Sequence, residues 1–141
     1  MANRTIGQRL GTISRLFLKR INEKVLTTGL TGSQLSVIRL LINGSLTQRE
    51  ICQDLSIEAS TGSTMIHSME NLGWVSRSVD ERDKREKKVQ LTERSKQYLP
   101  VWLEMSKNLH HHALDGISIQ DVEIFERVLD KITLNLKNEE K

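Results

Sequence analysis

Six consecutive charged residues, Asp-Glu-Arg-Asp-Lys-Arg at positions 80–85, form the segment of the sequence best suited to bind a charged partner. Such a run cannot join a hydrophobic core, and short β-prone runs, 74–77 and 87–91, flank it. This arrangement predicts a β-hairpin with the charged run at its tip. Residues 77–96 carry eight basic and five acidic side chains, an excess equal to the net charge of +3 of the whole chain. The hairpin is therefore a candidate contact for nucleic-acid phosphates.

The alternation of sign within the tip suggests a division of roles. An aspartate can hold one arginine in place, which leaves another free to extend into a minor groove, where negative potential is focused. We expect Arg82 to be this minor-groove residue and Asp80 to brace it. The other basic residues expected to contact DNA around the hairpin are Arg77, Lys84, Arg85 and Lys87. The alternative is a solvated loop, because charge runs usually face water.

A predicted helix over residues 59–72 precedes the hairpin. Helical spacing gathers its apolar residues on one side: Ala59, Met65, Ile66, Met69 and Leu72. The other side carries short polar groups in place of the lysines and glutamates common on a merely soluble helix. Short hydroxyl side chains allow a close approach to a major groove. The residues expected to contact DNA from this helix are Ser60, Thr61, Ser63, Thr64 and His67. The alternative is an ordinary surface helix.

Other predicted helices position these two features. Capping-box patterns at Thr31–Gln34 and Thr47–Glu50 start two helices before residue 59 and complete a helix-turn-helix. Thr47 and Gln48 are also expected to contact DNA. Helices are predicted over residues 4–27 and 93–114, and a last one begins after Ser118.

The first and last predicted helices carry broad apolar stripes, which favour self-association. The residues expected to form a dimer interface are Ile6, Leu10, Ile13, Phe17, Val122, Phe125, Leu129, Ile132 and Leu136.

Composition narrows the class of protein. A chain of 141 residues with 37% hydrophobic and 28% charged residues is typical of one soluble domain. It has no apolar run of membrane-spanning length and one cysteine, Cys52, so we expect a cytoplasmic protein with no membrane partner and no internal disulfide. It also lacks a phosphate-binding glycine loop, a nucleophile elbow and a credible acid–base pair. We therefore expect neither enzyme activity nor a cofactor.

Three further features are weaker candidates for sites. Residues 110–112 are consecutive histidines, which point about 100° apart on a helix and so cannot all bind one metal ion. Cys52 lies among apolar residues, where cysteine is usually inert. Phe17, Trp102 and Met105 form a possible ligand cleft, although helical spacing favours a core role for them. We expect no metal site.

These motifs resemble those of the multiple-antibiotic-resistance regulator (MarR) family of bacterial transcription factors. The resemblance rests on Leu30-Thr31-x-x-Gln34, on residues 47–55, and on a wing signature over residues 72–92. It implies a mainly α fold with a small β-hairpin, in which a winged helix-turn-helix lobe (31–91) lies between dimerisation helices (4–27 and 93–138) of a single domain, 1–141. It also implies a homodimer that binds a palindromic DNA operator, most often as a repressor released by a small aromatic ligand. The family's wing arginine and bracing aspartate correspond to Arg82 and Asp80.

The sequence departs from the family pattern at three positions. Ser68 stands where a basic residue is usual near the end of the recognition helix. Gly62 replaces an apolar residue, at a helix-propensity cost of about 1 kcal/mol. Ser95 replaces a glycine after the wing.

Two alternative functions remain open from the sequence. The first is a helical protein-interaction module, whose apolar helices would bind a different protein. The second is a metal-responsive regulator that uses residues 110–112.

Overall fold

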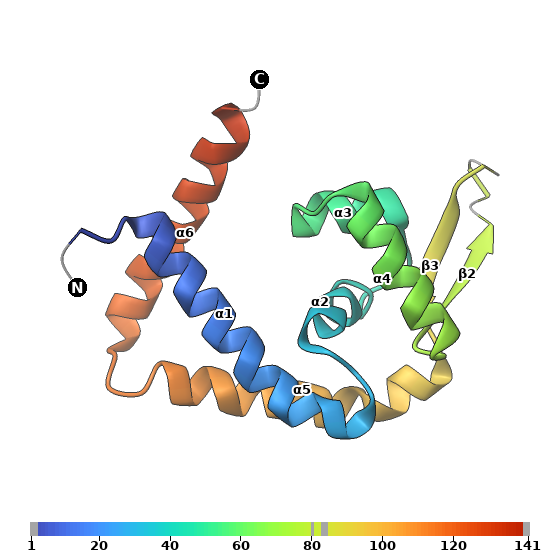
Figure 1. Ribbon diagram of the computed structural model, residues 1–141, viewed down its shortest axis with the longest axis horizontal. Coiled ribbons are helices and arrows are strands. Elements are labelled where there is room, and N and C mark those ends of the chain that lie inside the picture. Colours follow the sequence, from blue (N-terminus) through green and yellow to red (C-terminus); the bar gives the residue numbers. More distant parts are fainter. Residues whose placement is uncertain (1–2, 80, 83–84, 140–141) are drawn as a thin grey trace. The chain divides into compact units, whose positions relative to one another are not determined.

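The computed structural model describes residues 3–79, 81–82 and 85–139, which form a mainly helical fold with a small sheet (Figure 1). The predicted fold class is therefore confirmed. In chain order the elements are α1 (Ile6–Val25), the 3-10 helix η1 (Leu26–Thr28), α2 (Gly32–Leu40), β1 (Leu46–Thr47), α3 (Gln48–Leu55), α4 (Ala59–Asn71), β2 (Val75–Val79), β3 (Lys87–Leu91), α5 (Glu93–Ala113) and α6 (Ile119–Glu139).

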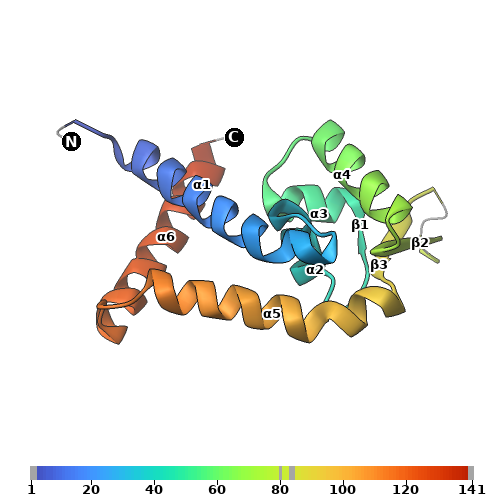
Figure 2. The same ribbon diagram turned by 60° about the horizontal axis from the view of Figure 1, so that its bottom comes forward.

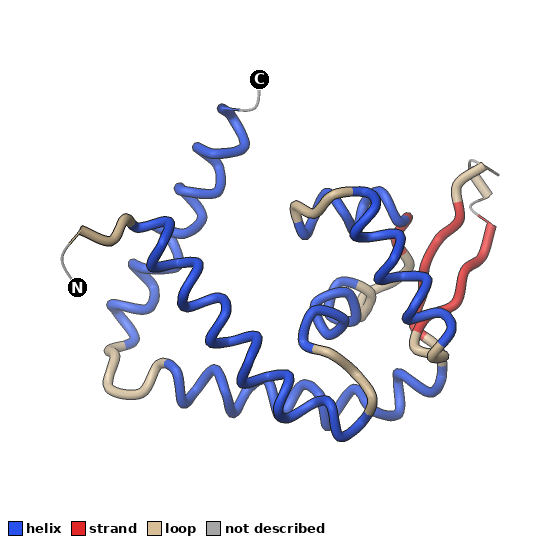
Figure 3. The backbone as a smooth tube through the Cα atoms, in the orientation of Figure 1, coloured by secondary structure: helices blue, strands red, loops and turns tan. Residues whose placement is uncertain are grey.

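The chain divides into two compact units, Met1–Lys107 and Asn108–Lys141. The first unit contains α1 to α4, the sheet and most of α5, and the second contains the end of α5 and all of α6. Within the first unit, the hairpin lies beside α4 (Figure 3). The larger part of α5 passes close to the end of α1 (Figure 2), where the Trp102 indole donates a hydrogen bond to Thr28 Oγ1 over 2.8 Å.

Capping side chains start the helices α2 and α3. Thr31 and Thr47 each accept a hydrogen bond from the backbone N–H three residues ahead, and Gln34 and Glu50 reciprocate, as predicted. Thr5 forms a third capping box with Gln8. Each box satisfies backbone donors that a helix start would otherwise leave unpaired. These local interactions fix where α2 and α3 begin.

The sheet has one more strand than the predicted hairpin. Strand β3 lies between β2 and β1, with Val89 paired to Arg77 on one side and to Leu46 on the other. The two residues of β1 are too few to show an alternating pattern, and Thr47 also serves as the N-cap of α3. Strand β1 therefore ties the start of α3 to the middle of β3.

An aromatic cluster forms the core between the hairpin and α5. Trp74 packs edge-on against Tyr98 and Trp102, with ring centroids 5.6 and 5.1 Å apart. Trp102 is 0% exposed. Its predicted place in an open ligand cleft is therefore corrected: neighbouring rings enclose its side chain. Phe17 and Met105 keep some exposure, and their part in a cleft remains a prediction.

The contact between α3 and α4 depends on a missing side chain. Gly62 is buried in the middle of α4, and a Cβ added there would lie 2.1 Å from the Sγ atom of Cys52 on α3. Such a distance is far inside van der Waals contact, so the two helices can approach this closely only because residue 62 is glycine.

Large apolar side chains remain exposed on α1 and α6. On α6 no residue is buried, and Phe125 and Leu136 are 47% and 60% exposed. On α1, Ile6, Ile13 and Phe17 are exposed as well. Surfaces of this kind mark interaction sites. In addition, none of the helices in residues 3–79, 81–82 and 85–139 is long and apolar enough to cross a membrane.

Candidate nucleic-acid interface

The outer face of α4 consists of short polar side chains. All five of its predicted DNA-contact residues are exposed: Ser60, Thr61, Ser63, Thr64 and His67. The opposite face is anchored by the buried residues Gly62, Ile66 and Met69. Ala59 and Leu72, which were expected on the apolar side, are instead exposed, because they lie at the two ends of the helix beyond the packed region. The face offers hydroxyl groups and an imidazole, and Glu70, which is paired with Arg77, is the acidic side chain within α4.

Thr47 has one of the two roles predicted for it, that of the helix cap. Its side chain is buried, its Oγ1 accepts a hydrogen bond from the Glu50 backbone N–H over 3.1 Å, and the same hydroxyl donates to Glu50 Oε1 over 3.0 Å. The hydroxyl is therefore committed to capping α3, which corrects the expectation that Thr47 contacts DNA. Gln48 is half-buried at the first position of the helix, and its predicted contact stays a prediction.

The wing, defined as β2, β3 and the turn between them, carries exposed basic residues at its far end. Arg82, Arg85 and Lys87 are exposed there. Asp80 and Lys84 lie outside the described residues, so the proposed brace of Arg82 by Asp80 stays a prediction.

Among the described residues, two ion pairs connect the wing to the helices. Arg77 on β2 lies 3.5 Å from Glu70 on α4, and Glu86 lies 3.4 Å from Arg49 on α3. The Arg77 side chain is only 23% exposed, so the structure gives it a bracing position between β2 and α4. Its predicted DNA contact stays a prediction. Neither pair was anticipated, because each joins side chains on different elements and leaves no periodic signal in the sequence.

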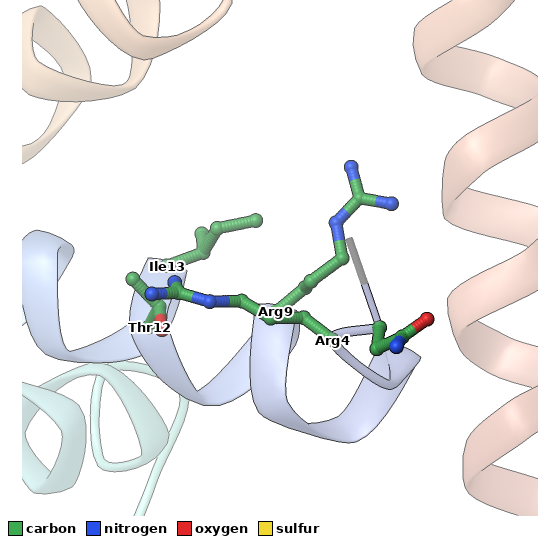
Figure 4. Close-up of a pocket in the computed structure, with 5 residues that line it drawn as sticks. Arg4, Arg9, Thr12 and Ile13 are labelled. Atoms are coloured by element: carbon green, nitrogen blue, oxygen red, sulfur yellow. The ribbon is translucent and has the colours of Figure 1, made fainter. Parts of the chain in front are cut away.

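Two cavities lie along the first turns of α1. One, of about 420 Å³, is lined by Asn3, Arg4, Arg9, Thr12 and Ile13 (Figure 4). The other, of about 410 Å³, is lined by Arg4, Gly7, Gln8, Gly11, Thr12 and Arg15. Neither includes the residues that were expected to line a ligand cleft.

The described residues do not assemble a metal site. No group of three or more histidine, cysteine, aspartate or glutamate side chains among them could hold an ion. Residues 110–112 are exposed along the last turn of α5, and Cys52 is buried against α4.

Comparison with known proteins assigns the family. A model of the MarR family matches residues 28–86, which extend from η1 into the wing. The HTH-type transcriptional regulator YwoH of Bacillus subtilis (strain 168), itself uncharacterised, is 40% identical over 107 residues, covering 74% of this chain and 77% of YwoH. The chain belongs to the MarR family. It is accordingly a DNA-binding transcriptional regulator with a winged helix-turn-helix, and neither alternative function is favoured.

Solved structures share the fold. A putative MarR-family regulator from Listeria monocytogenes, complexed with a 26mer DNA, matches with a TM-score of 0.89 at 21% identity, covering 97% of this chain and 92% of that one. CouR from Rhodococcus jostii RHA1, bound to p-coumaroyl-CoA, matches with a TM-score of 0.79 at 22% identity, covering 91% of each chain.

Proposed function

We propose that this MarR-family protein is a homodimeric, sequence-specific repressor that binds a palindromic operator. Each protomer places the exposed face of α4 in a major groove and its wing in the adjacent minor groove. The observation that carries the proposal is the pairing of two surfaces. A hydroxyl-rich and almost uncharged helix face lies beside a wing whose exposed residues include Arg82, Arg85 and Lys87.

The exposed apolar side chains of α1 and α6 support the homodimer. A symmetric dimer would bury them and would place two copies of α4 on one face of the duplex. Half-sites would then repeat at about one helical turn, roughly 10 bp, or slightly more. The DNA-bound relative from Listeria monocytogenes supports this mode of binding. The predicted cytoplasmic location is part of the proposal, because a regulator of transcription must reach its DNA.

Release by a small aromatic ligand is the regulatory part of the proposal. CouR, which has the same fold, is described with p-coumaroyl-CoA bound. Because Trp102 is enclosed in the core, Phe17 and Met105 are the remaining predicted cleft residues. Titration of the DNA complex with phenolic acids and their coenzyme A thioesters tests this part. Release of DNA supports it, and an unchanged complex across the set contradicts it.

The operator is the first unknown to determine. Selection of bound duplexes from a random DNA pool should recover an inverted repeat, and a pool with no enriched sequence would contradict sequence-specific binding.

Replacing Arg82 by alanine should weaken binding to the recovered operator by about 1–3 kcal/mol, roughly 5- to 150-fold, because an extended arginine in a minor groove is lost. Gel-shift titration at fixed salt measures the change. Arg15→Ala is the matched control, since it removes an exposed arginine from α1, distant in sequence from the wing. Equal affinity of Arg82→Ala and the unmodified protein would show that the wing assignment is wrong.

Operator affinity should fall steeply as salt rises. Each phosphate contact releases condensed counterions, so the logarithm of the binding constant should decline linearly with the logarithm of salt concentration, by about 0.9 per contact. Lys87→Ala should reduce the magnitude of this slope by about 0.9, the value for one phosphate contact. A flat response in the unmodified protein would count against phosphate contacts.

A further inference from the structure

The segment that joins α4 to the wing is held by side chains from a third element. Leu72 caps α4, Gly73 has a φ of +80°, and Trp74 leads into β2. A change of a few degrees here would rotate the recognition helix relative to the wing. The carbonyl groups after a helix end have no partner within the helix and must be satisfied from elsewhere. The partners of these carbonyls therefore decide how firmly the joint is fixed.

Three side chains at the start of α5 bind three consecutive carbonyls of this joint. Arg94 Nη1 donates to the carbonyl of Leu72, and Thr92 Oγ1 donates to that of Gly73 over 2.7 Å. The Ser95 hydroxyl, which is fully buried, donates to the carbonyl of Trp74. We call residues Thr92, Arg94 and Ser95 the junction clamp.

In addition to its hydrogen bond, Arg94 makes a cation–π contact in the junction clamp. Its guanidinium carbon lies 3.9 Å from the centroid of the Trp74 ring, in the geometry of a cation–π interaction. A Cβ added to Gly73 would lie 3.4 Å from its Nη1 atom, so the backbone of the joint passes directly against the guanidinium group. A cation at this place also complements the negative end of the α4 dipole. A lysine side chain has no planar group that could donate to the Leu72 carbonyl and stack on the Trp74 ring at the same time.

The junction clamp is anchored to a cluster of aromatic rings. Trp74 packs on Tyr98 and Trp102, whose rings stack with centroids 5.4 Å apart on α5. Trp102 in turn donates to Thr28 in η1, which follows α1. The joint between α4 and the wing is therefore fixed to α5 by hydrogen bonds, a cation–π contact and ring packing together.

We propose that Arg94 is a positioning residue for DNA binding: it sets the angle between α4 and the wing so that both fit one stretch of duplex. This inference rests on the proposed function, because it requires that α4 and the wing bind DNA together. Arg94 acts through the backbone of residues 72–74 and needs no contact with DNA. The loss of Arg94 should therefore impair recognition of the operator while leaving general attraction to DNA intact.

The experiment compares Arg94→Ala with Arg94→Lys and with Lys96→Ala, a control on the same turn of α5 whose side chain pairs with Glu93. Affinity is measured for the selected operator and for a scrambled duplex of equal length and composition, each over a range of salt. We expect Arg94→Ala to lose roughly 10-fold for the operator, in the range of couplings between packed residues. Binding to the scrambled duplex and the salt slope should not change. Arg94→Lys should lie between, and Lys96→Ala should match the unmodified protein.

Other outcomes would overturn the inference. A phosphate contact by Arg94 would lower affinity for both duplexes and reduce the salt slope, and a general loss of folding would lower binding to both duplexes equally. If Arg94→Ala fails to fold, Arg94→Lys carries the test, and full operator affinity in that soluble variant contradicts the positioning role. If Arg94→Ala keeps full operator affinity while Arg82→Ala clearly loses it, the positioning role of Arg94 is rejected and the proposed function stands. Absence of operator binding by the unmodified protein would instead reject the proposed function itself.

Discussion

Replacing Phe125 by aspartate should dissociate the proposed homodimer and remove most of the affinity for DNA. Phe125 is 47% exposed on α6, so the substitution leaves the packing of its own unit largely unchanged. Burying a phenylalanine at an interface contributes about 1.5–3 kcal/mol, and a two-fold symmetric interface loses this twice. The expected loss of about 3–6 kcal/mol raises the dimer dissociation constant roughly 100-fold or more. Sedimentation across a range of micromolar concentrations measures it.

DNA binding should weaken with the dimer because the two lobes would no longer act together. Once one lobe is bound, a dimer holds the other at a high effective concentration over the second half-site, which contributes about 10²- to 10⁴-fold in affinity. A Phe125→Asp monomer should therefore bind the full operator little better than it binds a single half-site.

Gln120→Glu is the matched control for this prediction. Gln120 is exposed on α6, well away from Phe125 around the helix, and the change also adds one negative charge. It should leave the dimer and its DNA affinity intact. A stable monomer of the unmodified protein at micromolar concentration would contradict the homodimer and favour a helical module that binds a different protein.

The parts of the fold that the sequence predicts well are those with local physical causes. The capping boxes at Thr31 and Thr47 are visible in the sequence because donor and acceptor lie three residues apart. The hydroxyl-rich face of α4 follows from helical period alone. The wing follows from two β-prone runs on either side of a charged turn. In each case the interacting residues are neighbours in the chain, so their pattern carries the information.

Contacts between residues far apart in the chain cannot be predicted from local sequence patterns. The pairing of Leu46 with Val89 and the ion pair of Arg49 with Glu86 join positions roughly 40 residues apart. Thr47 illustrates a different failure, since a residue type suited to phosphate contact is also the residue type that caps helices. Ser95 shows the reverse: the sequence alone gives no role to this departure from the family pattern, whereas in the fold its hydroxyl is a buried donor to the Trp74 carbonyl.

Gly62 is the position where sequence and structure lead to opposite expectations. Helix propensity alone predicts that Gly62→Ala stabilises α4 by about 1 kcal/mol. The structure reverses the sign, because the new methyl group would lie 2.1 Å from Cys52 Sγ. Forcing extra volume into a packed contact typically costs about 1–3 kcal/mol. We therefore expect Gly62→Ala to lower the free energy of unfolding by up to about 3 kcal/mol, measured by urea denaturation at fixed protein concentration.

The same contact predicts that a second substitution restores stability. In a Cys52→Ala background the sulfur is gone, and the nearest remaining atoms are Ile57 Cδ1 at 3.7 Å and the Cβ of residue 52 at 3.8 Å, both ordinary contacts. Gly62→Ala should then be neutral or stabilising, so the two substitutions should couple by about 2–3 kcal/mol. Gly7→Ala is the control: it lies on α1, 3.9 Å from Thr5 Oγ1, and should gain helix stability in either background. Equal effects of Gly62→Ala with and without Cys52 would contradict the close approach of α3 and α4. Operator affinity can be measured on the same variants. If Gly62→Ala weakens operator binding and the double variant regains it, the close contact of α3 with α4 also places the exposed face of α4, because α4 packs against α3.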